Sequence, residues 1–382
     1  MRNLLNAGTV RRALIPDGTR TTRRNKATSA GKGLITMAAA LALLMPAFAV
    51  RAGDHQPPES QPTEVRLLAS GLMGTIGSTI GPDGALYVAE GALGRITRIN
   101  LSTRKATTFA SGLPAAVPGV GIGGPMDVAF VGTTAYVLVA LVDSTVGGHQ
   151  KDGIYRVDDR YNSTLLVDLG TWSFNNPPTP GVPFNYFLPE GLQFALQPIG
   201  DGFLVSDGHL NRILRVSKDG TEITVLKQFN DVVPTGLAKA GGTVFLAELG
   251  PSPNTPDTGK VVSFGLSDKH PLAPAHEVAS GVSMIVGTAF GTNGKLYALS
   301  QGIAPAGIQP GQPASPNTGR LLRVNYDGTF TILADKLDRP TSLNFVCDTA
   351  YIVTLTGEVW EVEDVGEQAD HDQSCDACDH RD

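Results

Sequence analysis

The chain has 382 residues, of which 30 are Lys or Arg and 36 are Asp or Glu, so its formal net charge at pH 7 is −6. An acidic balance disfavours binding to nucleic acid or to an anionic membrane, and it leaves cations or neutral molecules as the natural partners. The 45 Gly and 26 Pro residues fit a fold with many tight turns, and no long amphipathic helix is evident beyond the N-terminal region.

Residues 1–52 are predicted to form an export signal. They contain seven Arg, two Lys and one acid, and they end in an apolar run at 34–50. Ala47 and Ala49 fit the small-x-small pattern of signal cleavage. A retained membrane anchor is the alternative, but the run contains Pro46 and falls short of the roughly 20 residues that span a bilayer. We expect an exported protein, extracellular or periplasmic, without stable membrane insertion after cleavage. Two Arg-Arg pairs leave twin-arginine export open.

Cleavage would change the charge of the chain. Removing nine basic residues and one acid leaves 21 Lys and Arg against 35 Asp and Glu, a net charge of −14. Residues 53–62 are predicted to be a linker, and the folded part is expected to be a soluble monomer.

A motif of one small or polar residue, one basic or polar residue and alternating apolar residues recurs six times. Its copies lie at 94–99, 152–157, 211–216, 259–264, 319–324 and 357–362. A unit that repeats every 45 to 65 residues and contains only short strands is typical of a β-propeller. The sequence therefore predicts one all-β domain at 63–365, a six-bladed propeller with four antiparallel strands in each blade.

Each repeat divides into four predicted strands, here called a to d in chain order. Strand a is expected at 75–80, 125–130, 189–194, 234–237, 285–290 and 340–345, often with Pro at its start. Strand b carries a large apolar residue in one register, namely Tyr87, Tyr136, Leu204, Phe245, Tyr297 and Tyr351. Strand c is the motif itself. Strand d is expected at 107–112, 164–170, 223–229, 276–281 and 329–334.

Only five d strands follow the six a–b–c sets. Residues 64–71 end in the same Leu-Ala-Ser-Gly pattern as the other d strands, so they are predicted to complete the last blade. This pairing would close the ring and remove the exposed sheet edges that promote aggregation.

The long connections are predicted to share one face of the ring. These are the b–c segments 140–151, 249–258 and 301–318 and the d–a segments 113–124 and 171–188. Loops on one rim of a rigid scaffold commonly carry binding residues, which favours a binding function for this long-loop face.

Carboxylates are expected near the channel on that face. Glu90, Asp207 and Glu248 end b strands, and Asp127 and Glu190 stand near the starts of a strands. The register of Asp127 is predicted to hold Gly77, Gly191, Gly236, Gly287 and Ser342 in the other blades. Such an oxygen-rich site would suit Ca²⁺ or another divalent cation. The alternative is that these acids cap strand ends and accept hydrogen bonds from loop N–H groups.

Two histidines in neighbouring b–c loops, His149 and His209, are candidate acid–base or ligand groups on the rim. The acidic tail at 366–382 contains His371, Cys375, Cys378 and His380. Residues at this spacing could bind Zn²⁺, or the two cysteines could form a disulfide. The interpretation that we favour is a disordered acidic tail. With three cysteines in the chain, a disulfide framework is not expected to hold the fold, and Cys347 is expected to be buried or half-buried.

Four segments, at 69–72, 81–90, 124–128 and 234–237, resemble the ScyD/ScyE family, whose name comes from genes of scytonemin biosynthesis. The likeness covers residues 63–362, and it implies a secreted six-bladed propeller similar in repeat style to NHL and gluconolactonase-like propellers. Val139 departs from the polar residue expected at the end of strand b. The resemblance carries over no catalytic residue.

The leading functional hypothesis is an exported, monomeric propeller that binds a small polar molecule, a glycan or a protein on the long-loop face. The alternative is a metal-dependent hydrolase of the lactonase type, in which the five carboxylates surround one cation and activate water. A quinone-dependent sugar dehydrogenase is less favoured, because no constellation of His and Arg is evident in the core.

Overall fold

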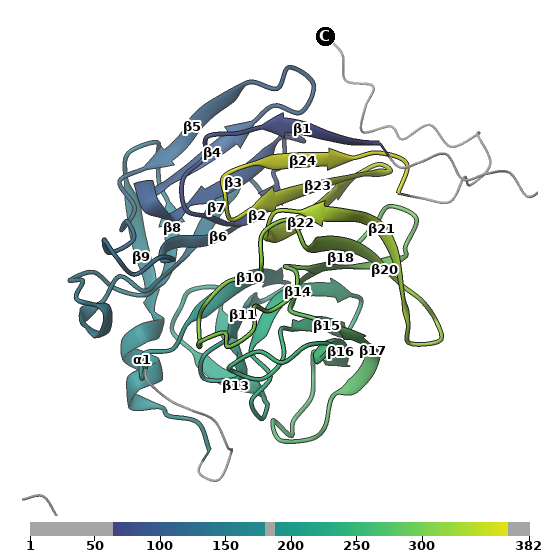
Figure 1. Ribbon diagram of the computed structural model, residues 1–382. Coiled ribbons are helices and arrows are strands. Elements are labelled where there is room, and N and C mark those ends of the chain that lie inside the picture. The colour runs from purple at the N-terminus through teal and green to yellow at the C-terminus, as the bar shows by residue number, and fades with distance from the viewer. Residues whose placement is uncertain (1–63, 180–187, 366–382) are drawn as a thin grey trace, which may run out of the picture. The chain divides into compact units, whose positions relative to one another are not determined.

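In the computed structural model, the described residues, 64–179 and 188–365, form six four-stranded antiparallel sheets arranged as blades in a ring (Figure 1). They lie within one compact unit, Ser60–Asp382. The fold is thus a six-bladed β-propeller, as predicted. The export signal, the linker at 53–62 and the tail at 366–382 lie outside the described residues.

Within each blade the four strands lie side by side from the ring axis outward, and in blades 1 to 5 they follow chain order. Blade 1 contains β2 (Thr75–Ile80), β3 (Leu86–Glu90), β4 (Arg95–Ile99) and β5 (Ala106–Ser111). Blade 2 contains β6 (Gly124–Val131), β7 (Thr134–Ala140), β8 (Gly153–Val157) and β9 (Ser163–Asp168). Blade 3 contains β10 (Gln193–Ile199), β11 (Gly202–Asp207), β12 (Arg212–Ser217) and β13 (Ile223–Gln228).

The second half of the ring repeats this order. Blade 4 contains β14 (Pro234–Ala240), β15 (Thr243–Glu248), β16 (Gly259–Gly265) and β17 (His276–Val282). Blade 5 contains β18 (Ile285–Phe290), β19 (Leu296–Ser300), β20 (Gly319–Val324) and β21 (Phe330–Leu337). Blade 6 contains β22 (Pro340–Val346), β23 (Thr349–Thr354) and β24 (Val359–Val362), and its fourth strand is β1 (Val65–Ala69).

The pairing of β1 with β24 closes the ring, which confirms the prediction for residues 64–71. Val65 lies opposite Val362 and Arg66 opposite Glu361, so the first described strand is the outer edge of the last blade. Figure 1 shows the purple β1 beside the yellow β24.

The core lies between neighbouring blades. Tyr87, from the aromatic register of the second strands, packs edge-on against Phe109 of its own blade at 4.9 Å between ring centroids and against Phe130 of blade 2 at 4.8 Å. Such aromatic pairs add to the stabilisation that comes from burying their area. The predicted alternation is therefore explained, since one side of each sheet packs against the next blade.

Several predicted strand boundaries differ from the observed ones, and at two of them a helix or a turn replaces the expected strand residues. The outer strand of blade 2 was expected to reach Gly170, but it ends at Asp168, whose carboxylate accepts the Thr171 N–H and caps helix α1 (Leu169–Asn175). Two short 3-10 helices, η1 (Gly91–Leu93) and η2 (Ser144–Val146), are also present. The fold is nearly all-β rather than strictly so.

The inner strand of blade 3 begins later than predicted. Leu188 to Gly191 form a turn, in which Gly191 has a φ of +85° and donates its N–H to the Leu188 carbonyl, so the strand starts at Gln193 instead of 189. Ala195, which pairs with Ser206, therefore takes the register that was assigned to Gly191. Asp127 pairs with Leu138 in the equivalent position.

Cys347 lies in the turn between β22 and β23 and is half-buried, as expected. It is disulfide-bonded, which the sequence analysis did not predict. The other two cysteines of the chain belong to the tail. None of the described helices is long and apolar enough to span a bilayer.

Candidate functional site

Glu90 is held by a dense set of hydrogen bonds at the end of β3. Arg95 Nε donates to its Oε1 at 2.7 Å and Arg95 Nη2 to its Oε2 at 3.1 Å, while the Met73 N–H and the Thr97 hydroxyl also donate to this carboxylate. The Glu90 side chain is fully buried. All of its strong acceptor positions are therefore used within the protein.

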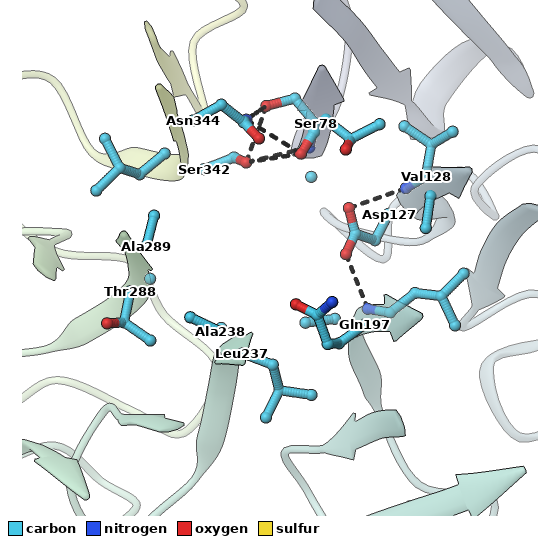
Figure 2. Close-up of a pocket in the computed structure, with 18 of the residues that line it drawn as sticks. Ser78, Asp127, Val128, Gln197, Leu237, Ala238, Thr288, Ala289, Ser342 and Asn344 are labelled. Atoms are coloured by element: carbon cyan, nitrogen blue, oxygen red, sulfur yellow. Dashed lines mark hydrogen bonds between the residues drawn. The ribbon is translucent and has the colours of Figure 1, made fainter. Parts of the chain in front are cut away.

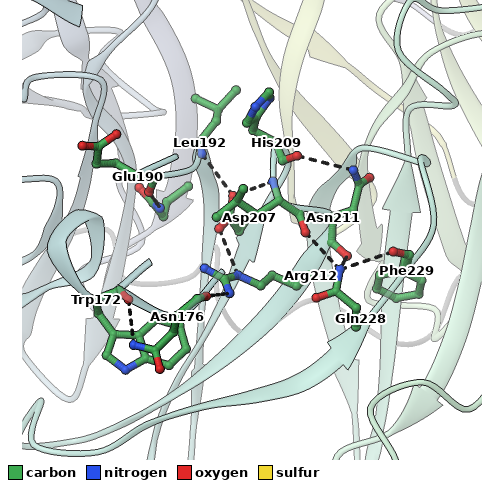
Figure 3. A network of polar contacts seen from close by, with 12 residues as sticks. Trp172, Asn176, Glu190, Leu192, Asp207, His209, Asn211, Arg212, Gln228 and Phe229 are labelled. Carbon is green, nitrogen blue, oxygen red and sulfur yellow. Dashed lines mark hydrogen bonds and ion pairs between the residues drawn. The ribbon is translucent and has the colours of Figure 1, made fainter. Parts of the chain in front are cut away.

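Asp207 occupies the same place in blade 3 (Figure 3). Arg212 Nε donates to it at 3.2 Å, and the N–H groups of Leu192 and Leu210 donate at 3.0 and 3.1 Å. The Arg212 guanidinium also donates to the Asn176 carbonyl and lies 5.1 Å from the centre of the Trp172 ring. This network ties α1 to blade 3 beneath the long-loop face.

Glu248 lies opposite Lys260 on the neighbouring strand. Its side chain is buried, and this burial raises its pKa to about 7, partly opposed by the charge of Lys260. Lys260 itself donates to Glu277 at 2.7 Å. Glu248 is thus a buried acid whose cationic neighbour is shared with another carboxylate.

Glu190 lies apart from these three acids, in the turn before β10. It interacts electrostatically with Asp143 and Asp152, whose pKa values are raised, first by burial and further by the charges within this group. Asp143 Oδ2 and Glu190 Oε2 are buried and have no hydrogen-bond partner. Among the described residues, no group of three or more His, Cys, Asp or Glu side chains is arranged to hold a metal ion.

A cavity of about 420 Å³ opens among the connections of the long-loop face. We call it the rim cavity. Its walls are mainly apolar and come from several blades; they include Ile122, Leu141, Val146, Val233, Met284 and Leu355. Ligand sites in proteins are typically concave, mostly apolar and supplied with a few placed polar groups, and the rim cavity has these properties.

His209 is one of the polar groups that line the rim cavity. Its Nε2 accepts the Leu188 N–H at 3.0 Å, and burial lowers its pKa, although the charges of Asp207 and Asp231 oppose this shift. The imidazole is therefore favoured in its neutral form. His149, the other candidate histidine, is exposed and does not line this cavity.

Asn211 and Asn254 are polar residues of the rim cavity that the sequence analysis missed. Asn211 adopts a φ of +54°, and its Oδ1 accepts the N–H groups of Val232 and Val233, which fixes the entry to blade 4. Its place in the repeated motif, where most copies have Gly, was the available signal. Asn254 is 9% exposed, and its Oδ1 has no partner.

A second cavity of about 510 Å³ is lined by residues from all six innermost strands, so it surrounds the ring axis. We call it the channel cavity. Figure 2 shows Asp127 on its wall, with Ser78, Ser342 and Asn344 on the neighbouring part of the ring. Burial raises the pKa of Asp127 to about 7, opposed by the Leu196 and Val128 N–H groups that donate to it.

An apolar layer lies at the level where the two cavities meet. Ile76, Met126 and Ala140 are buried there, with Leu192 and Phe194 packed against them. Phe194 and Thr341 line both cavities. The axis of the ring therefore passes from an apolar cavity on the long-loop face to a polar channel on the opposite side.

No family model and no curated protein matches the sequence. Solved structures with the same fold include a gluconolactonase from Xanthomonas campestris, with 13% identity, a TM-score of 0.53, and coverage of 79% of this chain and 89% of the other. The PQQ-bound aldose sugar dehydrogenase of Streptomyces coelicolor is similar at 16% identity and a TM-score of 0.54, with 79% and 98% covered. A calcium-binding regucalcin from Agrobacterium tumefaciens has 14% identity and a TM-score of 0.52, with 79% and 94% covered. These likenesses show that the fold belongs with gluconolactonase-like six-bladed propellers, and they show the fold alone.

Proposed function

We propose that this chain is an exported propeller that binds a small, largely apolar molecule with a few hydrogen-bonding groups in the rim cavity. Export rests on residues 1–52, and membership of the ScyD/ScyE family rests on the four matching segments. The observation that carries the proposal is the rim cavity itself, an apolar hollow of about 420 Å³ whose wall includes Asn254, a residue with a buried, unpartnered carbonyl oxygen.

The composition of the walls determines the class of ligand. When an apolar ligand covers an apolar wall, binding is favoured by about 25 cal/mol for each Å² of apolar surface removed from water. A sugar would leave most of its hydroxyl groups without partners against Leu141, Met284 and Leu355. An aromatic or terpenoid ring system with one or two donors fits better, because Asn254 Oδ1 has no partner among the described residues and could accept a hydrogen bond from the ligand once the side chain turns toward the cavity.

The proposal is tested with Nile red, a neutral apolar dye that fluoresces strongly when it leaves water. We expect saturable binding to the wild type and at least about tenfold weaker binding to Val146→Trp, since the indole would fill a wall position of the rim cavity. Ile332→Trp, at a residue 52% exposed and outside the cavity, is the matched control and should bind as the wild type does. Equal binding by all three proteins, or no binding, would overturn the proposal.

A lactonase-type hydrolase that uses a divalent cation is the second candidate. The observation that favours it is the pair of buried, unpartnered oxygens of Asp143 and Glu190 beside Asp152 on the long-loop face; in the described part of the chain these acids form no preformed metal site, so a cation would have to draw them together. A cation bound there would stabilise the native state. We expect millimolar Ca²⁺ to raise the melting temperature of the wild type but not of Glu190→Gln; the absence of any shift against chelator would remove this candidate.

A further inference from the structure

The wall of the channel cavity carries an ordered polar patch. Asn344 Nδ2 donates to Ser78 Oγ at 2.8 Å and to the Ser78 carbonyl at 3.1 Å, and Ser78 Oγ lies 2.9 Å from Ser342 Oγ. These residues come from the innermost strands of blades 1 and 6, which are neighbours in the ring. The patch is therefore held in place by the fold before any ligand arrives, which lowers the entropic cost of binding.

Small residues at the same level leave room around Asp127. A Cβ atom on Gly77 would stand 2.3 Å from Asp127 Oδ1, so a side chain at position 77 would collide with the carboxylate. Gly236, Gly287 and Ala195 also border the cavity. Phe194 and Thr341 line both this space and the rim cavity, so the two cavities adjoin at the level of the apolar layer. The channel cavity is thus a polar pocket.

Asp127 brings a carboxylate to this pocket without a counter-charge. Its two oxygens each accept one backbone N–H, from Val128 and from Leu196, both at 2.8 Å. Within the described part of the chain it takes part in no ion pair, and Lys239, the cationic residue of the lining, is exposed. Because burial raises the pKa of Asp127 to about 7, a ligand that supplies positive charge and N–H donors beside its spare lone pairs would favour the ionised form of this group.

We propose that the channel cavity is a second binding site, for a small molecule that carries a primary ammonium group beside several hydroxyl groups. The ammonium group would lie against Asp127. The hydroxyl groups would bond to Ser342, Asn344 and the amide of Gln197, which Figure 2 shows on the wall beside Asp127. This site differs from the rim cavity in the chemistry of its lining, although the two cavities share Phe194 and Thr341.

Glucosamine and glucose are suitable probes, since they differ in one group, an ammonium in place of a hydroxyl. We expect calorimetry on the wild type to detect glucosamine binding at least about tenfold tighter than glucose binding, as charge-assisted hydrogen bonds are the stronger kind. Asp127→Asn should remove this preference. Asp201→Asn, an exposed acid on the turn between β10 and β11, should keep it.

Asp127→Asn can also disturb the hydrogen bond that Asp127 accepts from the Leu196 N–H, and this loss could impair folding. A second variant therefore keeps the test decisive. Gln197→Leu removes a wall amide whose only side-chain hydrogen bond goes to the Pro198 carbonyl within the described residues, and it should weaken glucosamine binding several-fold. Equal affinities for the two sugars, no detectable glucosamine binding, or unchanged binding by both variants would overturn the proposal.

Discussion

Arg212 donates to Asp207 across 3.2 Å, and at most 1% of either side chain is exposed. The same register holds an acid opposite a base in blades 1 and 4, where the basic residue of the repeated motif lies directly opposite the end of the second strand. Arg95 faces Glu90 and Lys260 faces Glu248 in this register. Three of the six repeats, those of blades 1, 3 and 4, therefore place an acid and a base opposite each other below the long-loop face.

Removing the cation from this pair is predicted to be costly. Arg212→Met should lower the free energy of unfolding by about 3–5 kcal/mol, because it leaves the Asp207 carboxylate buried and uncompensated. Arg215 lies on the same strand as Arg212 and forms an exposed ion pair with Asp201. Arg215→Met should therefore lower the free energy of unfolding by no more than about 1 kcal/mol. Urea denaturation of both variants measures the difference, and similar losses would contradict the role assigned to Arg212.

Closure of the ring by β1 gives a second prediction. Leu68 is 6% exposed and packs against blade 6 and blade 1, whereas its neighbour Leu67 is 41% exposed. Leu68→Ala should cost about 2–4 kcal/mol and Leu67→Ala less than about 0.5 kcal/mol. Thermal or urea unfolding distinguishes them. Equal effects would mean that β1 does not contribute to the core.

Glu248 makes stability depend on pH in a defined direction. Its pKa in the folded protein is about 7, above the ordinary value of 4.5, so the native state holds this proton more strongly than the unfolded state. Stability from this group is then lost as the pH rises from about 5 to 8. Glu248→Gln should gain about 2–3 kcal/mol over the wild type at pH 8.5 relative to pH 5.5. Glu222→Gln, on the exposed surface, is the control and should show no such difference.

Asn254 links the proposed binding function to stability. Its Oδ1 is buried without a partner, and an unmet acceptor of this kind costs about 1–3 kcal/mol. Asn254→Leu should therefore raise the melting temperature of the unliganded protein. Asn325→Leu should lower it, because Asn325 bonds to Thr329 and Thr331. A lower melting temperature for Asn254→Leu would show that the carbonyl is satisfied in solution.

The repeat was sufficient to predict the blades and the closing strand, because each blade buries the same registers against its neighbour. It also contains the information needed to predict the ion pair of Glu90 and Arg95, because these two residues are five positions apart on strands joined by a short connection. The start of β10 was predicted too early because Pro189 matches the Pro that begins other inner strands. In the structure, residues 188–191 form a turn that Gly191 closes.

The rim cavity could not be predicted in the same way. Asn254 and Asp231 lie on connections that do not repeat, and only the closed ring brings them into one wall. Periodicity reports which side of a strand is buried, and it carries no information on where irregular loops meet. The channel wall was partly predicted, since Asp127 was recognised as an exception among small residues.

The most direct test of the proposed function is the structure of a crystal soaked with 6-bromo-2-naphthol, a largely apolar bicyclic molecule with one hydroxyl donor. The anomalous signal of bromine reports its position without bias from the refined coordinates. We predict a bromine peak in the rim cavity among Leu141, Met284 and Leu355, with the hydroxyl within hydrogen-bond distance of Asn254 Oδ1. A peak at another place on the protein, or an empty rim cavity in fully soaked crystals, would contradict it.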